Sequence, residues 1–463
     1  MHDANDNRKE IRRYLDTMSS PFGATTEPLA IILAAGHGKR IKSATSKMLH
    51  EIWGEPTVVR VSNAARDGLQ AANQVIVVGI KAREVAETVG RRDHLVFAYQ
   101  AQQNGTGHAV RVALEQIPDH DALGDIYIFP GDMGLIDAET TRMFKQAFLS
   151  SGCDMMVLTG LFDGDASSNT YGRILRVPAV DVDGTCSGPD QGKVIEIKEH
   201  KDILALADDE LYRVRYRSRT YSFSKQSLIE NQEFNTGVFA FKADRLKEHI
   251  GQLNTDNVQG ELYLTDLIGM FNASQLSVGA IAAADNRAVV GFNTKSVLRE
   301  MNDIAREKVY RQLKDLVAFE DRNDFFLADD IVEQIIRFDT EQGPLDLTIG
   351  KGAFLETGLT LNRGVKIGRG ARLSGVVELG ENCRIGDGVT ITGTEEFPTK
   401  LGRNVTITGS SNISGCTIED DVLVEHTILE HKTIKRIRGR DGKVQPVRFV
   451  RPQSEGLSAI NSL

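Results

Sequence analysis

Two different hydrophobic patterns divide the chain. From residue 29 to about residue 294, short runs of consecutive apolar residues alternate with stretches of helical spacing. The apolar runs are LAIILAAG, NQVIVVG, LVFAYQ, DIYIFPGD and CDMMVLTG, and TTRMFKQAFLSS is one of the amphipathic stretches. Strands that are apolar on consecutive residues are typical of a sheet covered on both faces, and alternation with helices favours parallel pairing. The pattern predicts an α/β domain over residues 28–294 with a Rossmann-like, mostly parallel or mixed sheet.

A six-residue period governs much of the remaining chain. Aliphatic residues recur at every sixth position from residue 349 to 391, the phase resumes at 401 after a loop, and it slips by one at 418. The positions are Ile349, Leu355, Leu361, Ile367, Leu373, Leu379, Ile385, Ile391, Leu401, Ile407, Ile413, Ile418 and Val424. This period fits neither an amphipathic helix nor a meander of hairpins, and it is typical of hexapeptide repeats. We predict a short left-handed parallel β-helix over residues 346–430.

Three further segments flank these domains. Residues 1–27 are predicted to form a charged helix and a linker, an N-terminal extension that we expect to be peripheral. Residues 295–345 are predicted as linker helices, because apolar residues stand at helical spacing between 296 and 319. Residues 431–463 form a basic tail, whose first interpretation is a solvated or partner-contacting segment and whose second is a contact with a polyanion.

Composition narrows the partners and the compartment. The net charge of -9 argues against general nucleic-acid binding. The four cysteines, at positions 153, 186, 383 and 416, lack the spacing of a metal site and are expected to be free thiols in a reducing compartment. No apolar run approaches the roughly 18 residues of a membrane span, and the N-terminus lacks the apolar core of a secretory signal. We therefore expect a cytoplasmic protein without nucleic-acid or membrane partners.

A glycine loop follows the first predicted strand and indicates phosphate binding. The segment LAAGHGKRIKSATSKMLH contains Gly36 and Gly38, then the cations Arg40 and Lys47. Glycines let backbone N–H groups approach phosphate oxygens, and the cations can neutralise them. The spacing fits neither a Walker A loop nor a dinucleotide fingerprint. By itself the loop is a weak signal, because an ordinary strand-to-helix turn also uses glycines.

Other polar residues are expected at the same edge of the sheet. Asp132 ends the run YIFPGD, as the glycine loop ends the first run. Ligands of open α/β sheets bind at the carboxyl ends of the parallel strands, where both segments would lie. A structural alternative for Asp132 is that it caps the following turn.

Several segments together carry a family resemblance. They are QAQQNGTGHA at 100–109, YGRI at 171–174, EIKEHKD at 196–202, FNTG at 234–237, QGELYLTD at 259–266 and GFN at 291–293. With the glycine loop, in this order and spacing, they resemble the uridylyltransferase domain of the bifunctional bacterial UDP-N-acetylglucosamine pyrophosphorylase and glucosamine-1-phosphate N-acetyltransferase family. The resemblance covers residues 29 to 294 and implies a nucleotidyltransferase domain.

The resemblance implies a division of roles along the chain. The residues expected to contact the nucleotide are Leu33, Ala34, Ala35, Gly36, Gln100, Gly105, Thr106 and Gly131. The amide of Gln100 suits uracil, which presents adjacent hydrogen-bond acceptors and a donor. The residues expected to hold the sugar are Gly172, Glu199 and Asn235. The expected catalytic residues are Arg40, Lys47 and Asp132.

The resemblance also implies a metal site and a reaction. Asp132 and Asn293 would supply oxygen ligands to one Mg²⁺ ion, which prefers such donors. The implied reaction joins UTP and N-acetylglucosamine 1-phosphate and releases pyrophosphate, by direct in-line attack without a protein nucleophile. Structural alternatives remain: Glu199 could pair with a neighbouring lysine, and Asn293 could be an ordinary loop residue. Functional alternatives are another sugar 1-phosphate or nucleotide, an acyltransferase acting through the β-helix, and a non-catalytic sugar-nucleotide sensor.

The chain departs from the family pattern in several places. Lys39 and Ser46 stand in the glycine loop, and Pro130 precedes Gly131-Asp132 where the family usually has tyrosine. Segments 178–192 and 204–230 look inserted, and the second is expected to be a solvated hairpin or else a lid that alters sugar choice.

Residues 340–463 contain no counterpart of the family's acetyltransferase strings. The histidines of this region, His426 and His431, lack a matching context. We expect acetyl transfer to be absent. Left-handed β-helices of the family pack as trimers, so the resemblance implies that the β-helix assembles a homotrimer, an arrangement that also hides sheet edges.

Overall fold

The computed structural model describes residues 2–451 apart from residues 25, 37, 39–40, 72 and 118–123, with side chains from residue 7 onward. The chain forms two compact units, one ending at Met301 and the other beginning at Asn302. None of the described helices is both long enough and apolar enough to cross a membrane.

The first unit contains a nine-stranded mixed sheet. Seven strands lie in the order β13-β7-β12-β6-β1-β4-β5, and β8 and β9 extend the sheet from β12. Their bounds are β1 Leu29–Ala34, β4 Asn73–Val78, β5 Leu95–Tyr99, β6 Ile126–Pro130, β7 Met155–Leu161, β8 Arg173–Arg176, β9 Val194–Lys198, β12 Glu233–Phe241 and β13 Val278–Ala282. β1 pairs in parallel with both β4 and β6, whereas β12 runs antiparallel to β6 and β7. Each of the five predicted apolar runs is a strand, and the predicted α/β fold is confirmed.

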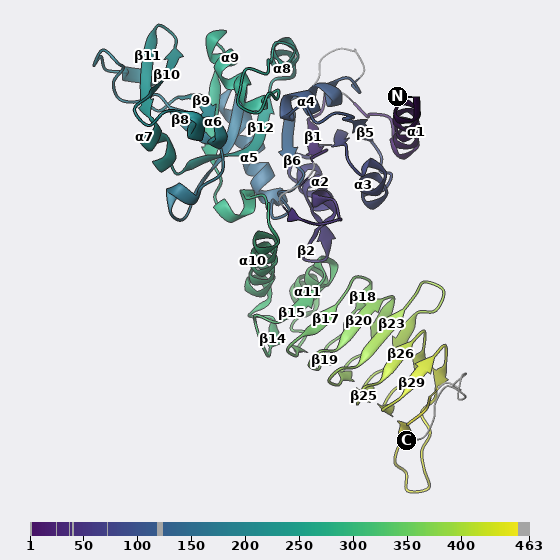
Figure 1. Ribbon diagram of the computed structural model, residues 1–463. Coiled ribbons are helices and arrows are strands. Elements are labelled where there is room, and N and C mark those ends of the chain that lie inside the picture. The colour runs from purple at the N-terminus through teal and green to yellow at the C-terminus, as the bar shows by residue number, and fades with distance from the viewer. Residues whose placement is uncertain are drawn as a thin grey trace, which may run out of the picture. The chain divides into compact units, whose positions relative to one another are not determined.

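Helices cover both faces of this sheet (Figure 1). One hydrophobic cluster packs α2 (Thr57–Leu69), α3 (Ala82–Val89) and α5 (Ala138–Ser151) against one face. The other cluster packs α4 (Thr106–Leu114), α8 (Ala243–Ile250) and α9 (Leu267–Ala273) against the opposite face. Residues of β4 are buried throughout, as expected for a strand between two helix layers. This two-sided burial explains why the strands are apolar on consecutive residues.

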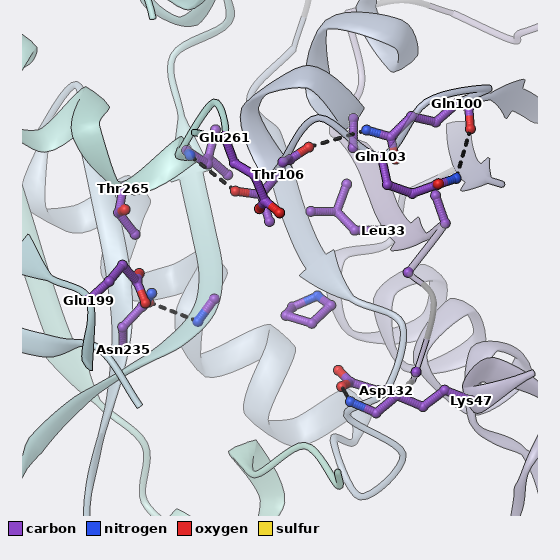
Figure 2. Close-up of a pocket in the computed structure, with 18 of the residues that line it drawn as sticks. Leu33, Lys47, Gln100, Gln103, Thr106, Asp132, Glu199, Asn235, Glu261 and Thr265 are labelled. Atoms are coloured by element: carbon purple, nitrogen blue, oxygen red, sulfur yellow. Dashed lines mark hydrogen bonds and ion pairs between the residues drawn. The ribbon is translucent and has the colours of Figure 1, made fainter. Parts of the chain in front are cut away.

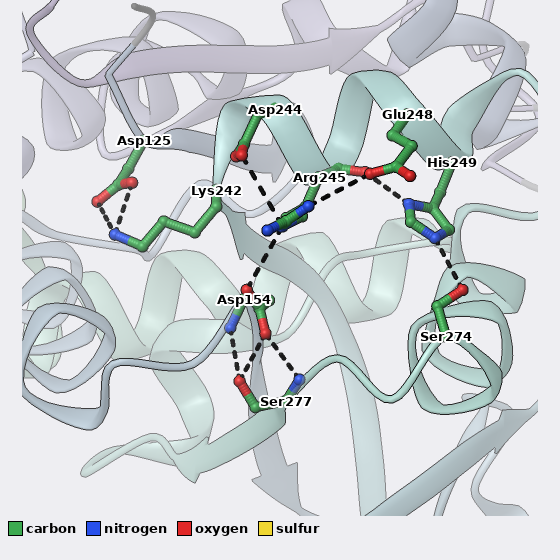
Figure 3. Close-up of polar contacts among 9 residues, drawn as sticks. All are labelled: Asp125, Asp154, Lys242, Asp244, Arg245, Glu248, His249, Ser274 and Ser277. Carbon is green, nitrogen blue, oxygen red and sulfur yellow. Dashed lines mark hydrogen bonds and ion pairs between the residues drawn. The ribbon is translucent and has the colours of Figure 1, made fainter.

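A polar network ties α8 to the strands beside it (Figure 3). Asp154, just before β7, accepts hydrogen bonds from the backbone N–H and hydroxyl of Ser277, each 2.8 Å long. Lys242 donates to Asp125 over 2.9 Å, and His249 contacts Ser274 Oγ at 3.0 Å. The Asp154–Ser277 contacts join the amino ends of the parallel strands β7 and β13, and the Lys242–Asp125 pair joins the end of β12 to the start of β6.

The N-terminal helix is part of the core. The predicted charged helix is α1 (His2–Met18), and Leu15 on it is only 1% exposed within the α2–α3–α5 cluster. Tyr14 donates to Glu87 of α3, and Arg83 pairs with Glu10 over 2.7 Å. The expectation of a peripheral extension is therefore wrong for this helix, because it covers α3 and the edge strand β5.

The segment predicted as the second insertion folds into a hairpin and a short helix. Its elements are β10 (Leu211–Tyr216), β11 (Arg219–Ser224) and α7 (Lys225–Glu230), and they follow α6 (His200–Ala205). One face of the hairpin packs into a hydrophobic cluster of its own, so the hairpin is only partly solvated.

The second unit is a parallel β-helix. Its strands stack into three parallel sheets (Figure 1). The first contains β14 Val317–Phe319, β16 Leu347–Ile349, β19 Lys366–Ile367, β22 Arg384–Ile385, β25 Thr406–Thr408, β28 Leu423–Glu425 and β31 Val447–Arg448. The second contains β15 Phe325–Leu327, β17 Ala353–Leu355, β20 Arg372–Gly375, β23 Thr390–Gly393, β26 Asn412–Ser414 and β29 Ile428–Glu430. The third contains β18 Leu359–Thr360, β21 Val377–Leu379, β24 Thr399–Leu401, β27 Thr417–Ile418 and β30 Thr433–Ile434.

Every aliphatic residue of the predicted six-residue period is buried in this unit. The period arises because each coil visits the three sheets in turn and points one side chain inward from each. Ile349, Ile367 and Ile385 occupy equivalent positions in consecutive coils of the first sheet. The hexapeptide prediction is therefore confirmed.

The β-helix begins earlier and ends later than the sequence pattern predicts. The segment 295–345 contains α10 (Lys295–Leu313) and α11 (Asp329–Gln342), but also β14 and β15, which pair with the first regular coil. Residues 317–319 are thus a strand and not the end of a helix. In the basic tail, β30 and β31 continue two sheets. These outer strands lack the six-residue spacing, and only their pairing reveals them.

Candidate active site

A cavity of about 730 Å³ opens at the carboxyl ends of β1 and β6 (Figure 2). The predicted site residues that line it are Leu33, Ala35, Gly36, Lys47, Gln100, Gly105, Thr106, Asp132, Glu199, Asn235 and Asn293. They come from segments up to 260 residues apart in the sequence. Some follow β5 and others follow β6, two strands that lie on opposite sides of β1 in the sheet. The carboxyl ends of the parallel strands β1, β5 and β6 supply the glycine loop, Gln100 and Asp132 at one edge. Asn235 and Glu199 come instead from the antiparallel strand β12 and the end of β9.

The glycine loop forms one wall of the cavity. Gly38 has a φ of +57°, and a Cβ on it would lie 2.8 Å from Lys47 Cβ, so the loop folds tightly against the segment that carries the lysine. Ala34 points into the core and does not line the cavity. Arg40, predicted as catalytic, and Lys39 lie outside the described residues.

Lys47 connects the two residues predicted to bind metal. It begins a short 3-10 helix, Lys47–Leu49, and its side chain is 9% exposed. Its ammonium forms an ion pair with Asp132 and donates to Asn293 Oδ1 over 2.9 Å. A Cβ on Gly291 would lie 3.1 Å from the Asp132 carboxyl group, so this glycine lets the GFN segment reach the aspartate. One cation thus contacts a carboxylate and an amide oxygen at the same time.

Gln100 lies at the opposite wall and is 3% exposed. Its Nε2 donates to the Gly105 carbonyl oxygen over 3.2 Å and lies 3.0 Å from His108 Nδ1. With His108 in the tautomer that carries its proton on Nε2, both amide hydrogens are used within the protein and Oε1 remains as an acceptor. Gly105 has a φ of +102°, where a Cβ would lie 2.5 Å from the Leu262 carbonyl oxygen. Thr106 Oγ1 accepts from Leu264 N, which joins this loop to the QGELYLTD segment.

The third wall carries Glu199 and Asn235 (Figure 2). Glu199 stands between β9 and α6, and Asn235 lies on β12. Asn235 Oδ1 accepts from Gly237 N over 2.8 Å, so its amide NH₂ group is the part left to donate to a ligand. Gly172 does not line the cavity. It lies behind both residues: its carbonyl oxygen accepts from Asn235 N, and a Cβ on it would approach the Glu199 carboxylate to 3.1 Å.

The electrostatics of the walls differ. Burial raises the pKa of Glu199 to about 7, and the negative charges of Asp202 and Asp266 act in the same direction. Beside Phe292, whose ring also contacts the Lys47 ammonium, burial lowers the pKa of His50, whose ring meets Phe292 edge-on at 6.0 Å. The cavity therefore has a cationic corner at Lys47 and an acidic corner at Glu199.

Comparisons with known proteins agree with this geometry. Residues 30–166 match the family model of the MobA-like NTP transferase domain. The chain is similar to bifunctional GlmU proteins. It is 37% identical to GlmU of Streptomyces avermitilis over 280 residues, 60% of this chain and 50% of that protein. It is 35% identical to GlmU of Streptomyces griseus over 289 residues, 62% of this chain and 52% of that protein. The match thus spans about half the length of these curated relatives.

A likeness to a solved structure is weaker. The structure of a UDP-glucose pyrophosphorylase complexed with UDP-glucose gives a TM-score of 0.42 at 11% identity, over 61% of this chain and 99% of that one. A score of this size carries no conclusion about function.

Several cavity residues received no role from the sequence. Gln103, Lys201, Glu261 and Thr265 also line the cavity. Glu261 and Thr265 belong to the QGELYLTD segment, so the presence of this motif was the sequence signal that could have identified them as cavity residues. Gly131 was predicted to contact the nucleotide, but it does not line the cavity. Its N–H donates to the Leu33 carbonyl oxygen over 3.0 Å and so joins β6 to β1.

The described residues contain no group of three or more His, Cys, Asp or Glu side chains that could hold a metal ion. A metal at this cavity would have two protein oxygen ligands, from Asp132 and Asn293. The ammonium of Lys47 touches both oxygens, so they lie close enough to share one cation. Carboxylate, amide, phosphate and water oxygens are the donors that Mg²⁺ prefers. The donor set therefore fits Mg²⁺ that is held jointly by the protein and a phosphate ligand.

Proposed function

We propose that this chain is a Mg²⁺-dependent sugar-nucleotide pyrophosphorylase that joins UTP and N-acetylglucosamine 1-phosphate and releases pyrophosphate. The observation that carries the proposal is one cavity with a glycine loop and lysine at one corner, a buried glutamine at another, and Glu199 with Asn235 at a third. These corners suit a triphosphate, a nucleobase and a sugar, respectively. The similarity to GlmU proteins supports the same reading.

The nucleobase preference follows from how Gln100 is held. With the proton of His108 on Nε2, both amide hydrogens of Gln100 are used by Gly105 and His108, and Oε1 is then the group of this side chain that remains to accept from a ligand. Uracil has an N3–H that can donate to this oxygen, whereas N3 of cytosine is itself an acceptor. An unpaired acceptor facing another acceptor disfavours binding. This arrangement supports UTP over CTP.

The proposed reaction needs no protein nucleophile. A phosphate oxygen of the sugar 1-phosphate attacks the α-phosphorus of UTP, a new P–O bond forms, and the bond to pyrophosphate breaks. The protein positions the two substrates in line and neutralises the charge that grows on the leaving pyrophosphate. Lys47 supplies positive charge at this corner, and Asn235 and Glu199 orient the sugar. Mg²⁺, held by Asp132 and Asn293, would screen the phosphate charges.

We further propose that the β-helix serves assembly and does not transfer acetyl groups. His426 and His431 both occupy turn positions, with φ values of +49° and +51°. Their rings stack on Phe449 and Phe397, at centroid distances of 5.6 and 4.1 Å. These contacts support structural roles for both histidines. Light scattering tests the trimer, and thiol release from acetyl-CoA with glucosamine 1-phosphate tests the loss of acetyl transfer.

The principal experiment measures pyrophosphate release from each of four NTPs with several sugar 1-phosphates and Mg²⁺. We expect turnover with UTP and N-acetylglucosamine 1-phosphate and little with CTP. Asp132→Asn keeps the side-chain shape and removes the charge, and should lower kcat at least 100-fold, the order of magnitude for lost electrostatic stabilisation. Absence of turnover with every pair would favour the sensor alternative. Full activity of Asp132→Asn would contradict the metal assignment.

A further inference from the structure

The hairpin β10–β11 packs directly behind the proposed sugar wall. Its inner face contributes Val214, Tyr216 and Tyr221 to a buried cluster. The same cluster contains Ile195 of β9 and Ile203 of α6, the two elements that flank Glu199. The hairpin therefore supports both sides of the junction at which Glu199 stands.

Tyr212 makes a polar contact from the hairpin to β9. Its hydroxyl donates to Glu196 Oε1 over 2.5 Å, and Lys198 Nζ lies 4.2 Å from its ring centroid. Glu196 and Lys198 point to the same side of β9, and Glu199 follows directly. Burial raises the pKa of the Glu196 carboxyl, and the hydrogen bond from Tyr212 offsets part of that effect. Tyr212 thus satisfies a carboxylate three residues from the sugar wall.

The helix after Glu199 is also held on its far side. Ile203 N donates to the Glu199 carbonyl oxygen over 3.0 Å, which starts α6 at this residue. Asp202 accepts from Val258 N over 3.2 Å, and Lys201 donates to Gln259 Oε1 over 2.5 Å. A shift of β9 or α6 on the hairpin would therefore displace Glu199 and the neighbouring cavity residue Lys201 together.

We infer that the β10–β11 hairpin is a positioning element for the sugar pocket, and that Tyr212 is the positioning residue through which it fixes Glu199. The expected effect on sugar binding rests on the proposed function, because Glu199 is the proposed sugar ligand. Neither the hairpin nor Tyr212 lines the cavity. Their effect must therefore reach the sugar through β9 and α6.

The chain offers a matched pair of variants. Tyr212→Phe removes the hydroxyl and keeps the ring that packs against Lys198. Arg213→Ala changes the next residue of β10, whose side chain is exposed on the outer face of the hairpin. Both variants alter β10, but only the first breaks the contact with β9.

The kinetic test measures KM for each substrate separately. In Tyr212→Phe, KM for N-acetylglucosamine 1-phosphate should rise about tenfold, the effect of leaving a buried carboxylate without a hydrogen bond, while KM for UTP stays within twofold. Arg213→Ala should change neither KM. Glu196→Gln in the Tyr212→Phe background should recover part of the loss, because it removes the unsatisfied charge. Equal rises in both KM values, or an unchanged sugar KM, would overturn the inference.

A second measurement does not depend on activity. Amide hydrogen exchange of residues 199–206 should be faster in Tyr212→Phe than in the wild-type protein and unchanged in Arg213→Ala. Equal exchange in all three proteins would overturn the inference even if the enzyme is active. Conversely, a wild-type protein without turnover would contradict the proposed function, while the exchange comparison would still decide whether Tyr212 holds this wall.

Discussion

Replacement of Glu199 by glutamine should stabilise the protein at alkaline pH, although it removes a proposed ligand of the sugar. In the folded protein burial raises the pKa of this carboxyl from 4.5 to about 7. In the unfolded chain the group returns to its ordinary value. The folded state therefore holds a proton on Glu199 that the unfolded state releases between these two pH values.

The sign of the pH dependence follows from that difference. Below pH 4.5 the carboxyl is protonated in both states and makes no pH-dependent contribution. As pH rises towards 7, proton release favours the unfolded state, and the free energy of unfolding falls. Above about pH 7 the folded protein carries an ionised carboxylate close to Asp202 and Asp266. The full cost of ionising the buried group is then present.

The magnitude follows from the size of the pKa change. Each pH unit corresponds to about 1.4 kcal/mol, so the full difference is about 3 kcal/mol. Glu199 lines an open cavity, and its side chain keeps part of its surface accessible to solvent. Water therefore screens part of this cost. We expect Glu199→Gln to gain about 2 kcal/mol relative to the wild-type protein between pH 5 and pH 8.

Urea unfolding at pH 5 and pH 8 measures this gain by linear extrapolation. Trp53, the single tryptophan of the chain, lies in the first unit and is 7% exposed, so its fluorescence reports on this unit. Glu261→Gln removes a carboxylate from another position in the same cavity and controls for the loss of one negative charge. A stability difference between Glu199→Gln and wild type that is the same at both pH values would refute the reasoning.

Two further predictions concern the cation site and the β-helix. Lys47→Met should raise the affinity of the nucleotide-free protein for Mn²⁺ at least about tenfold, measured by electron paramagnetic resonance, because the ammonium competes with a dication for Asp132 and Asn293. Lys201→Met, at the acidic corner, is the matched control, and equal Mn²⁺ affinities of Lys47→Met and wild type would contradict the assignment. Leu373→Ala should lower the free energy of unfolding of the β-helix by about 2–5 kcal/mol in calorimetry, because Leu373 is fully buried and the coils cannot close the cavity; a loss below 1 kcal/mol would mean that the coils repack.

The sequence by itself determined both architectures. Consecutive apolar residues identified the strands of the mixed sheet, because burial between two helix layers leaves no polar face. The six-residue period identified the β-helix, because each coil repeats the same inward position at every sheet. Local periodicity is therefore enough to predict an element whose apolar residues repeat at a fixed spacing, whether they cover one face of the element or both. It failed for β14, β15, β30 and β31, and it predicted the helix α1 but not its packing, because the burial of these elements depends on partners distant in the sequence.

The candidate site was only partly encoded in local sequence. Motifs placed Lys47, Asp132, Gln100, Glu199 and Asn235 at one cavity, and the structure brings them there. Sequence could not show that a single ammonium bridges Asp132 and Asn293, or that the side-chain nitrogen of Gln100 contacts Gly105 and His108. These facts depend on distances between segments that only the folded sheet sets.

The β10–β11 hairpin shows most clearly what the sequence predicts and what only the tertiary structure decides. Its sequence, RVRYRSRTYSFSK, predicted a basic and aromatic hairpin but left open whether it was solvated or a lid. The tertiary structure decided against a free hairpin, because Tyr216 and Tyr221 are buried with Ile203, and Tyr212 hydrogen-bonds to Glu196. Alternation within two strands fixes which side chains share a face. Which face is buried, and against what, depends on the neighbouring strand and helix, which the local sequence does not specify.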